Sequence, residues 1–240
     1  MRIAALALFL LSAAALPSRA ATVDVALVLA VDVSESVDDG RYELQHEGIA
    51  RAFENPQLAA AIRGGTHGVI DVLVLEWSDR DQQAVTVDWT PVKDKASAEA
   101  FAARVRASKR TSAGRTAIGD ALAAAKLAFD RLPDKADRRV IDLSGDGIAN
   151  IGPAPQDVRD LLVAEGIVIN GLAILETEPW LDQYYDANVV GGAGGFLMQV
   201  DSFENFGSAM LNKLLTEIVM TTSPAARRHA ALPLRLGQMQ

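Results

Sequence analysis

Three separate segments of the chain carry oxygen-bearing side chains in short patterns. Asp32, Ser34 and Ser36 form a D-x-S-x-S pattern, Thr116 follows a polar loop that contains a glycine, and Asp146 lies in an Asp-Gly pair. Together they offer three hydroxyls and two carboxylates, the oxygen ligands that Mg2+ and other hard cations prefer. Ser and Asp also end strands and cap helices for local reasons, so the first pattern alone leaves a metal site and a local cap both open.

The elements around these residues are expected to place them at one edge of a sheet. Val23–Val33 is a short apolar run typical of a buried parallel strand, and Asp32 lies near its end. A further strand over 139–143 ends just before Asp146, and a helical segment over 116–132 opens at Thr116. Open α/β sheets bind ligands outside the carboxyl ends of their strands, so we expect the three segments to meet there.

The rest of the chain alternates strands with helices, which predicts an α/β fold. The polar turn between strands 69–77 and 84–89 indicates a hairpin, and therefore one antiparallel edge strand. We predict a Rossmann-like, doubly wound, mostly parallel six-stranded sheet. Its remaining strands are expected at 166–175 and 196–200, and its remaining helices at 38–62, 95–107, 156–165, 179–189 and 203–220.

The two ends of the chain differ in character from its middle. Residues 1–20 have a positive start, an apolar run and small residues before Ala21, which predicts a secretory signal peptide. The protein is therefore expected in the periplasm or the extracellular medium, with no transmembrane segment in the mature chain. Residues 223–240 lose periodicity and are expected to form a flexible tail, or alternatively a segment that docks on an acidic partner.

Composition excludes several classes of function. The chain of 240 residues carries a net charge of −8, which makes nucleic acid or an anionic membrane surface a poor partner. It contains no cysteine, so it has no disulfide, thiol nucleophile or Cys-ligated zinc. His46, His67 and His229 are scattered and lack the spacing of a zinc motif.

The three patterns together resemble the von Willebrand factor type A (VWA) domain. The family's metal-ion-dependent adhesion site (MIDAS) has a D-x-S-x-S at the end of the first strand, a Thr before a helix and an Asp-Gly after the fourth strand. Asp32, Ser34, Ser36, Thr116 and Asp146 match these positions in the family's order. The resemblance covers about 23–220, so residues 21–222 are expected to form one VWA-like domain, most similar to compact exported bacterial members of undefined role.

The resemblance implies a bound divalent cation, most often Mg2+, with Mn2+ or Ca2+ as alternatives. Ser34, Ser36 and Thr116 would then bind the ion directly, and Asp32 and Asp146 directly or through water. A carboxylate of a protein partner typically fills the open coordination position. Neutral hydroxyls leave the ion short of negative charge, so it still attracts an external acid.

Two departures from the family pattern concern the site itself. Gly145 stands where the family more often has Thr, which removes one hydroxyl, and Ser144 is the candidate replacement. Glu35 lies inside the first motif and either faces solvent or occupies the open position. Of two other acids, Asp142 is expected to make a structural hydrogen bond within its strand, and Asp120 to lie on a solvated helix face or to support the site.

Three functional classes follow from these residues. A metal-dependent binding module is the main prediction, and a metal-free interaction scaffold is the first alternative. A metal-dependent phosphoester hydrolase is the second, with Asp32 and Asp146 holding Mg2+ and Glu35 as the only nearby base. No G-x-S-x-G or Walker motif is present, and no convincing nucleophile or base is found, so an enzyme is not expected.

Overall fold

The apolar run after Ala21 forms β1 (Thr22–Asp32), the strand around which the rest of the sheet is ordered. In the computed structural model, which describes residues 21–222, β1 pairs in parallel with both β2 (Ile70–Trp77) and β4 (Lys135–Gly145). The strand is buried along nearly its whole length, which explains its continuous apolar composition. The predicted signal peptide and tail lie outside the described residues.

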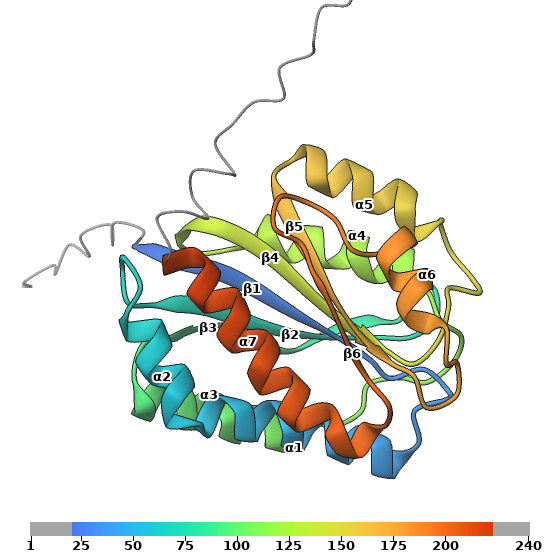
Figure 1. Ribbon diagram of the computed structural model, residues 1–240, viewed down its shortest axis with the longest axis horizontal. Helices are drawn as coiled ribbons and strands as arrows, with labels where there is room; N and C mark the ends of the chain where they lie inside the picture. Colours follow the sequence, from blue (N-terminus) through green and yellow to red (C-terminus); the bar gives the residue numbers. More distant parts are fainter. Residues whose placement is uncertain (1–20, 223–240) are drawn as a thin grey trace, which may run out of the picture.

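The sheet has six strands in the order β3-β2-β1-β4-β5-β6 (Figure 1). β3 (Gln83–Val92) pairs antiparallel with β2 at one edge, whereas β5 (Ile167–Ile174) and β6 (Leu197–Val200) continue in parallel at the other. The predicted mostly parallel sheet with one antiparallel edge strand is therefore confirmed. Strand order changes direction between β1 and β4, which is the switch point where such sheets bind ligands.

Helices cover both faces of the sheet (Figure 1). One face carries α1 (Asp39–Glu54), α2 (Pro56–Arg63), α3 (Lys95–Ala107) and α7 (Phe206–Thr222), the last preceded by a 3-10 turn at Phe203–Asn205. The other face carries α4 (Ile118–Phe129), α5 (Pro155–Ala164) and α6 (Leu181–Asn188). None of the described helices is long and apolar enough to span a membrane.

Alternation along β1 divides the apolar core into two layers. Leu27 and Leu29 pack in the layer beneath α1 and α7, whereas Ala26, Val28 and Ala30 pack in the layer beneath α4. Successive side chains of a strand point to opposite faces, so one buried strand supplies both layers. The small alanines of β1 face a helix that is itself rich in alanine, and this allows α4 to lie close to the sheet.

The prediction of one helix over 38–62 was wrong, because the segment forms α1 and α2. Asn55 separates them with an extended backbone (φ −68°, ψ 125°). Pro56 causes the break, since a proline disfavours helical dihedrals in the residue before it and is well suited to the first turn of a new helix. The Asn55 side chain then caps α2 by accepting a hydrogen bond from the backbone N of Gln57 at 2.9 Å.

Candidate metal centre

Asp32 lies at the carboxyl end of β1 and its side chain is fully buried. Its Oδ1 accepts a hydrogen bond from the backbone N of Ser34 at 2.7 Å, which bends the chain into a turn directly after the strand. Gln45 of α1 donates through Nε2 to the Asp32 carbonyl at 3.0 Å and fixes the turn from the helix side. The D-x-S-x-S segment is thus held by its own carboxylate and by α1.

The two serines of the motif face Asp146 after β4. Ser36 donates through Oγ to Asp146 Oδ1 at 2.6 Å, and the Oγ atoms of Ser34 and Ser36 lie 3.3 Å apart. Ser34 and Asp146 are buried, whereas Ser36 is exposed. The β1–α1 and β4–α5 connections therefore present one carboxylate and two hydroxyls at a common point that is reachable from the surface.

Thr116 lies two residues before α4 rather than within a helix over 116–132, so that predicted helix began too early. Its backbone N donates to Asn150 Oδ1 at 2.9 Å, and the backbone N of Asn150 donates back to the Thr116 carbonyl at 3.1 Å. This reciprocal pair ties Thr116 to the loop that carries Asp146. A Cβ placed on Gly147 would lie 3.8 Å from Thr116 Oγ1, which puts the hydroxyl beside the Asp-Gly pair.

Two arginines that sequence reasoning missed hold the backbone of the first motif. Arg110 donates through Nη2 to the carbonyls of Val33 (2.8 Å) and Ser34 (3.0 Å). Arg41 donates through Nη1 to the Ser36 carbonyl at 2.7 Å and pairs through Nη2 with Glu176 at 2.5 Å. Arg110 acts on backbone atoms 76 and 77 residues away, whereas Arg41 acts on a carbonyl five residues away and on Glu176, 135 residues away, so neither contact follows a recognisable sequence pattern.

Burial disfavours the charged form of both carboxylates of the site. Burial, together with the negative charge of Asp146, raises the pKa of Asp32 from 3.8 to about 7. Burial also raises the pKa of Asp146, against a hydrogen bond from Ser36 and the charge of Arg41, which lower it. Two buried carboxylates that oppose each other's ionisation are stabilised by a cation between them, since an opposite charge favours the ionised form of both.

Several buried oxygens at the site have no hydrogen-bond partner among the described residues. They include Asp32 Oδ2, Asp146 Oδ2, Ser144 Oγ and Tyr185 Oη. The nearest ion-pair partner of Asp146 Oδ2 is Arg41 Nη1, at 3.9 Å. Buried polar atoms are normally paired, so a cluster of unpaired oxygens is where an ion and its water molecules fit. The donor set of hydroxyls and carboxylates suits a hard divalent cation.

The remaining acids of the sequence analysis take different places. Glu35 is exposed, and its backbone N donates to the Gly114 carbonyl at 2.8 Å. Asp142 forms a buried ion pair with Lys213 of α7 and accepts a hydrogen bond from Asn170 at 3.3 Å, which is a structural role within the core. Asp120 has a buried Oδ2 without a partner in the described range, so it does not lie on a fully solvated face.

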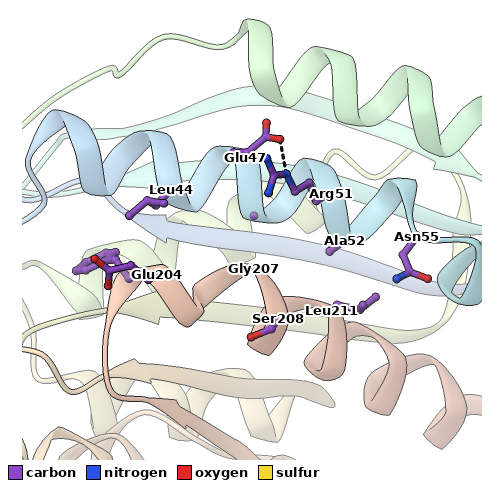
Figure 2. Close-up of a pocket in the computed structure, with 11 residues that line it drawn as sticks. Leu44, Glu47, Arg51, Ala52, Asn55, Glu204, Gly207, Ser208 and Leu211 are labelled. Atoms are coloured by element: carbon purple, nitrogen blue, oxygen red, sulfur yellow. Dashed lines mark hydrogen bonds and ion pairs between the residues drawn. The ribbon is translucent and has the colours of Figure 1, made fainter.

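Two cavities lie away from these residues. One, of about 360 Å3, is a groove between α1 and α7, where Gly48 and Gly207 let the helices approach closely (Figure 2). The other, of about 690 Å3, lies beside Arg110 and is lined largely by charged side chains of α1 and of 106–110. Neither contains any of the five predicted ligands, of which Ser36 is exposed and the other four are buried.

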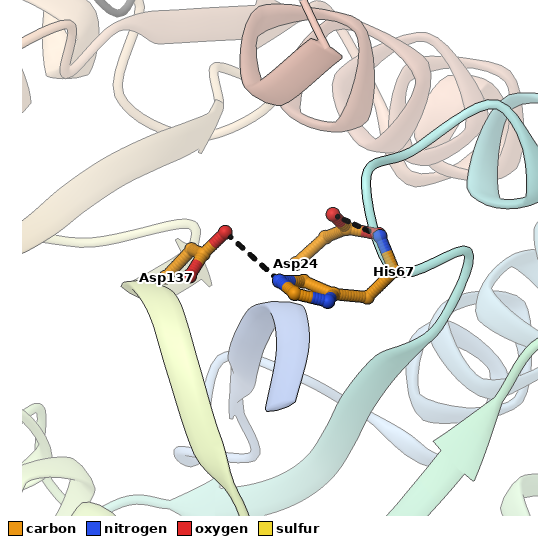
Figure 3. A group of neighbouring side chains, drawn as sticks. All are labelled: Asp24, His67 and Asp137. Atoms are coloured by element: carbon orange, nitrogen blue, oxygen red, sulfur yellow. Dashed lines mark hydrogen bonds and ion pairs between the residues drawn. The ribbon is translucent and has the colours of Figure 1, made fainter. Parts of the chain in front are cut away.

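Two of the histidines take part in networks that their scattered spacing did not predict. His46 Nε2 lies 3.1 Å from the buried carboxylate of Glu76, which also accepts from Tyr42 and Thr111. His67 lies with Asp24 and Asp137 at the opposite end of β1 from Asp32, and ligand atoms of the three lie within 4.8 Å of one another (Figure 3). Within residues 21–222, carboxylates therefore gather near each end of β1.

Comparisons with known proteins define the class to which this fold belongs. The chain is similar to a mussel byssus matrix protein described with a zinc-occupied MIDAS motif (16% identity, TM-score 0.58, 83% of this chain and 49% of that one). It is also similar to a von Willebrand factor type A protein from Catenulispora acidiphila (18%, 0.55, 82% and 43%). A third match is the vWF domain of the pilus tip protein Mfa5 from Porphyromonas gingivalis (12%, 0.58, 83% and 97%).

The fold is therefore that of a von Willebrand factor type A domain, as the sequence patterns predicted. Residues 22–222 match the model of the family described as "Protein of unknown function (DUF1194)", and the chain belongs to that family. The chain spans about half the length of the mussel protein and less than half of the Catenulispora protein. No curated protein matches the sequence.

Proposed function

We propose that this protein is an exported binding module that holds a divalent cation, with Mg2+ as the first candidate, and engages an acidic group of a protein partner through it. The observation that carries the proposal is the pair of buried carboxylates, Asp32 and Asp146, each with an unpaired oxygen among the described residues. A cation would supply a positive charge to both, in addition to the ion pair that Arg41 makes with Asp146 Oδ2 at 3.9 Å. Ser34, Ser36 and Thr116 would complete the oxygen shell.

The mixed charge of this shell explains how a partner would be bound. Where the neutral hydroxyls bind the ion directly and Asp32 and Asp146 act through water, the ion is not neutralised by its direct ligands, so it retains affinity for an external carboxylate. Ser36 is exposed beside this point, and Arg41 adds a positive charge at the same rim. The chemistry of the partner is therefore acidic, and its carboxylate would approach from the exposed side.

Binding rather than catalysis suits the position of the site. Small-molecule substrates are usually bound in concave pockets, and neither of the two cavities described above contains a predicted ligand. Glu35 is exposed and is the only candidate base that the sequence offered, so a hydrolase would lack a positioned proton acceptor. The pilus and matrix proteins that share the fold are consistent with an exported, protein-binding role.

The test is calorimetric titration of Mg2+ and Mn2+ into residues 21–240, with Asp32→Ala in parallel. The native protein is expected to bind saturably, and Asp32→Ala to lose binding while it keeps its fold. Saturating Mg2+ should also raise the melting temperature, because a ligand that binds only the folded state stabilises it. Unchanged Mg2+ affinity in Asp32→Ala would contradict the site, and no binding by either protein would favour the metal-free scaffold.

A further inference from the structure

Tyr185 of α6 brings a hydroxyl to the candidate centre from an element that carries none of the predicted ligands. The side chain is fully buried, and its Oη has no hydrogen-bond partner among the described residues. A tyrosine whose phenol is buried usually finds a partner for it, because an unpaired hydroxyl loses its hydration without compensation. We therefore expect a hydrogen-bond acceptor close to Tyr185 Oη.

Glycines on two neighbouring strands make room for this side chain. A Cβ on Gly171 of β5 would lie 3.2 Å from the Tyr185 ring. A Cβ on Gly145 at the end of β4 would lie 2.6 Å from Tyr185 Oη and 2.7 Å from Asp32 Oδ2, both too close for a real side chain. The hydroxyl and the unpaired carboxylate oxygen thus approach the same small volume, which is open only because residue 145 has no side chain.

The electrostatic surroundings of the phenol agree with this geometry. Burial and the negative charges of Asp32 and Asp146 raise the pKa of Tyr185 well above its usual value of 10.0. The phenol hydroxyl is a hydrogen-bond donor. Asp32 Oδ2 is an acceptor without a donor among the described residues. Tyr185 Oη can therefore act as the donor and Asp32 Oδ2 as the acceptor of one hydrogen bond.

We propose that Tyr185 is a positioning residue of the metal centre: when the ion is bound, its hydroxyl donates a hydrogen bond to Asp32 Oδ2, directly or through one water molecule, and orients that carboxylate toward the ion. This inference rests on the proposed function. It also explains Gly145: the hydroxyl that a side chain at this position could offer comes instead from α6. Ser144, the replacement expected from sequence, has a buried Oγ without a partner in the described range.

The direct test is Tyr185→Phe, which removes one oxygen and keeps the ring. Groups that orient metal ligands typically change metal affinity by 10–100-fold, so Mg2+ affinity should fall by about tenfold. The metal-free variant should melt at the same or a higher temperature than the native protein, because the substitution deletes a buried, unpaired hydroxyl. A purely structural role predicts the opposite pattern: a less stable metal-free protein with unchanged affinity.

Tyr184→Phe is the matched control. The Tyr184 hydroxyl accepts a hydrogen bond from the backbone N of Ala149 at 3.3 Å, so its loss should lower the melting temperature and leave Mg2+ affinity unchanged. Mg2+ should also perturb the near-ultraviolet tyrosine absorption of the native protein and of Tyr184→Phe. The same perturbation should be absent from Tyr185→Phe.

A double-mutant cycle tests the shared volume. Gly145→Ala should weaken Mg2+ binding in the native protein, because the new methyl group displaces Asp32 or Tyr185, and should weaken it less when Tyr185 is already Phe. Additive effects would contradict the contact. If the native protein binds Mg2+ and Tyr185→Phe binds it equally well, the role of Tyr185 is overturned while the metal site stands. If the native protein binds no Mg2+, both fail.

Discussion

Asp24 and Asp32 are both buried aspartates of β1, one near each end of the strand. Their carboxylates differ in how many of their oxygens accept a hydrogen bond. Asp24 accepts hydrogen bonds from the backbone N of His67 at 3.0 Å and of Gly68 at 2.9 Å, so both of its oxygens are paired. Asp32 has one paired oxygen and one unpaired oxygen, and it faces the second buried carboxylate of Asp146.

This difference in hydrogen bonding distinguishes a carboxylate with a structural role from one that has an oxygen available for a ligand. Backbone N–H groups directed at a carboxylate stabilise its charge, and at Asp24 they also hold the loop before β2 in place (Figure 3). His67 and Asp137 complete this group through an exposed contact of 3.2 Å. We interpret the Asp24 cluster as a loop anchor, because its geometry is accounted for without an ion, whereas the geometry around Asp32 is not.

The largest expected effect that tests this contrast is on pH dependence. The pKa of Asp32 is raised to about 7 in the folded, metal-free protein, so between about pH 4 and 7 the folded state holds a proton that the unfolded chain has released. The free energy of unfolding should therefore fall as pH rises through this window, by up to about 4 kcal/mol. Urea unfolding of metal-free protein across this range measures the slope.

Asp32→Asn isolates this effect, because Asp71, whose burial raises its pKa to about 6, acts in the same direction and remains in the variant. The variant should show a shallower fall. Saturating Mg2+ should remove the part of the fall that comes from Asp32 and leave the part that comes from Asp71, since the ion favours the ionised form of the Asp32 carboxylate. Parallel pH profiles for the native protein and Asp32→Asn would mean that Asp32 does not carry the raised pKa.

Asp24→Ala should be the next largest change, and it should act on stability alone. The substitution leaves the backbone N–H groups of His67 and Gly68 without their acceptor, at a cost of about 2–3 kcal/mol in the free energy of unfolding. Mg2+ affinity should be unchanged, which is the reverse of Asp32→Ala. Denaturant unfolding measures the stability of the two variants, and calorimetry measures their Mg2+ affinity. A loss of Mg2+ binding in Asp24→Ala would contradict a purely structural role for Asp24.

Ser36→Ala should have an intermediate effect that is confined to the metal site. Removing the exposed hydroxyl that donates to Asp146 takes away one proposed ligand, and Mg2+ affinity should fall by about tenfold, or about 1.4 kcal/mol. Ser208→Ala is the control, since Ser208 is also exposed and its Oγ also makes one hydrogen bond, at 2.8 Å to the Asn205 carbonyl. Equal affinities in the two variants would remove Ser36 from the ligand set.

His67→Ala should be the mildest change. The His67–Asp137 contact is exposed on both sides, and such pairs contribute less than about 1 kcal/mol. The backbone N of residue 67 still donates to Asp24 in the variant. A Zn2+ titration sharpens the interpretation: saturable binding that survives in Asp32→Ala and is lost in His67→Ala would identify the Asp24 cluster as a second metal site rather than an anchor.

The order of strands and helices could be predicted because each element carries its own periodicity. The apolar runs of β1, β2 and β5 are buried on both faces and are recognisable without any partner. The ends of the elements were harder to predict from the sequence. β4 begins at Lys135, where charged residues pair with the start of β1. The predicted strand over 139–143 missed this part. Pairing between distant segments, rather than local preference, extends that strand.

For the candidate site, too, the sequence determines some features and the tertiary structure determines others. The types and order of Asp32, Ser34, Ser36, Thr116 and Asp146 are properties of the sequence, because short motifs at strand ends are local. Asp32 Oδ1 is paired locally by the backbone N of Ser34, whereas Asp146 Oδ1 is paired by Ser36 from a distant segment. Arg110 binds the carbonyls of Val33 and Ser34 from 77 and 76 residues away in sequence, and Tyr185 lies near Asp32 although 153 residues separate them. Only the packing of distant segments against the sheet brings these groups to the site.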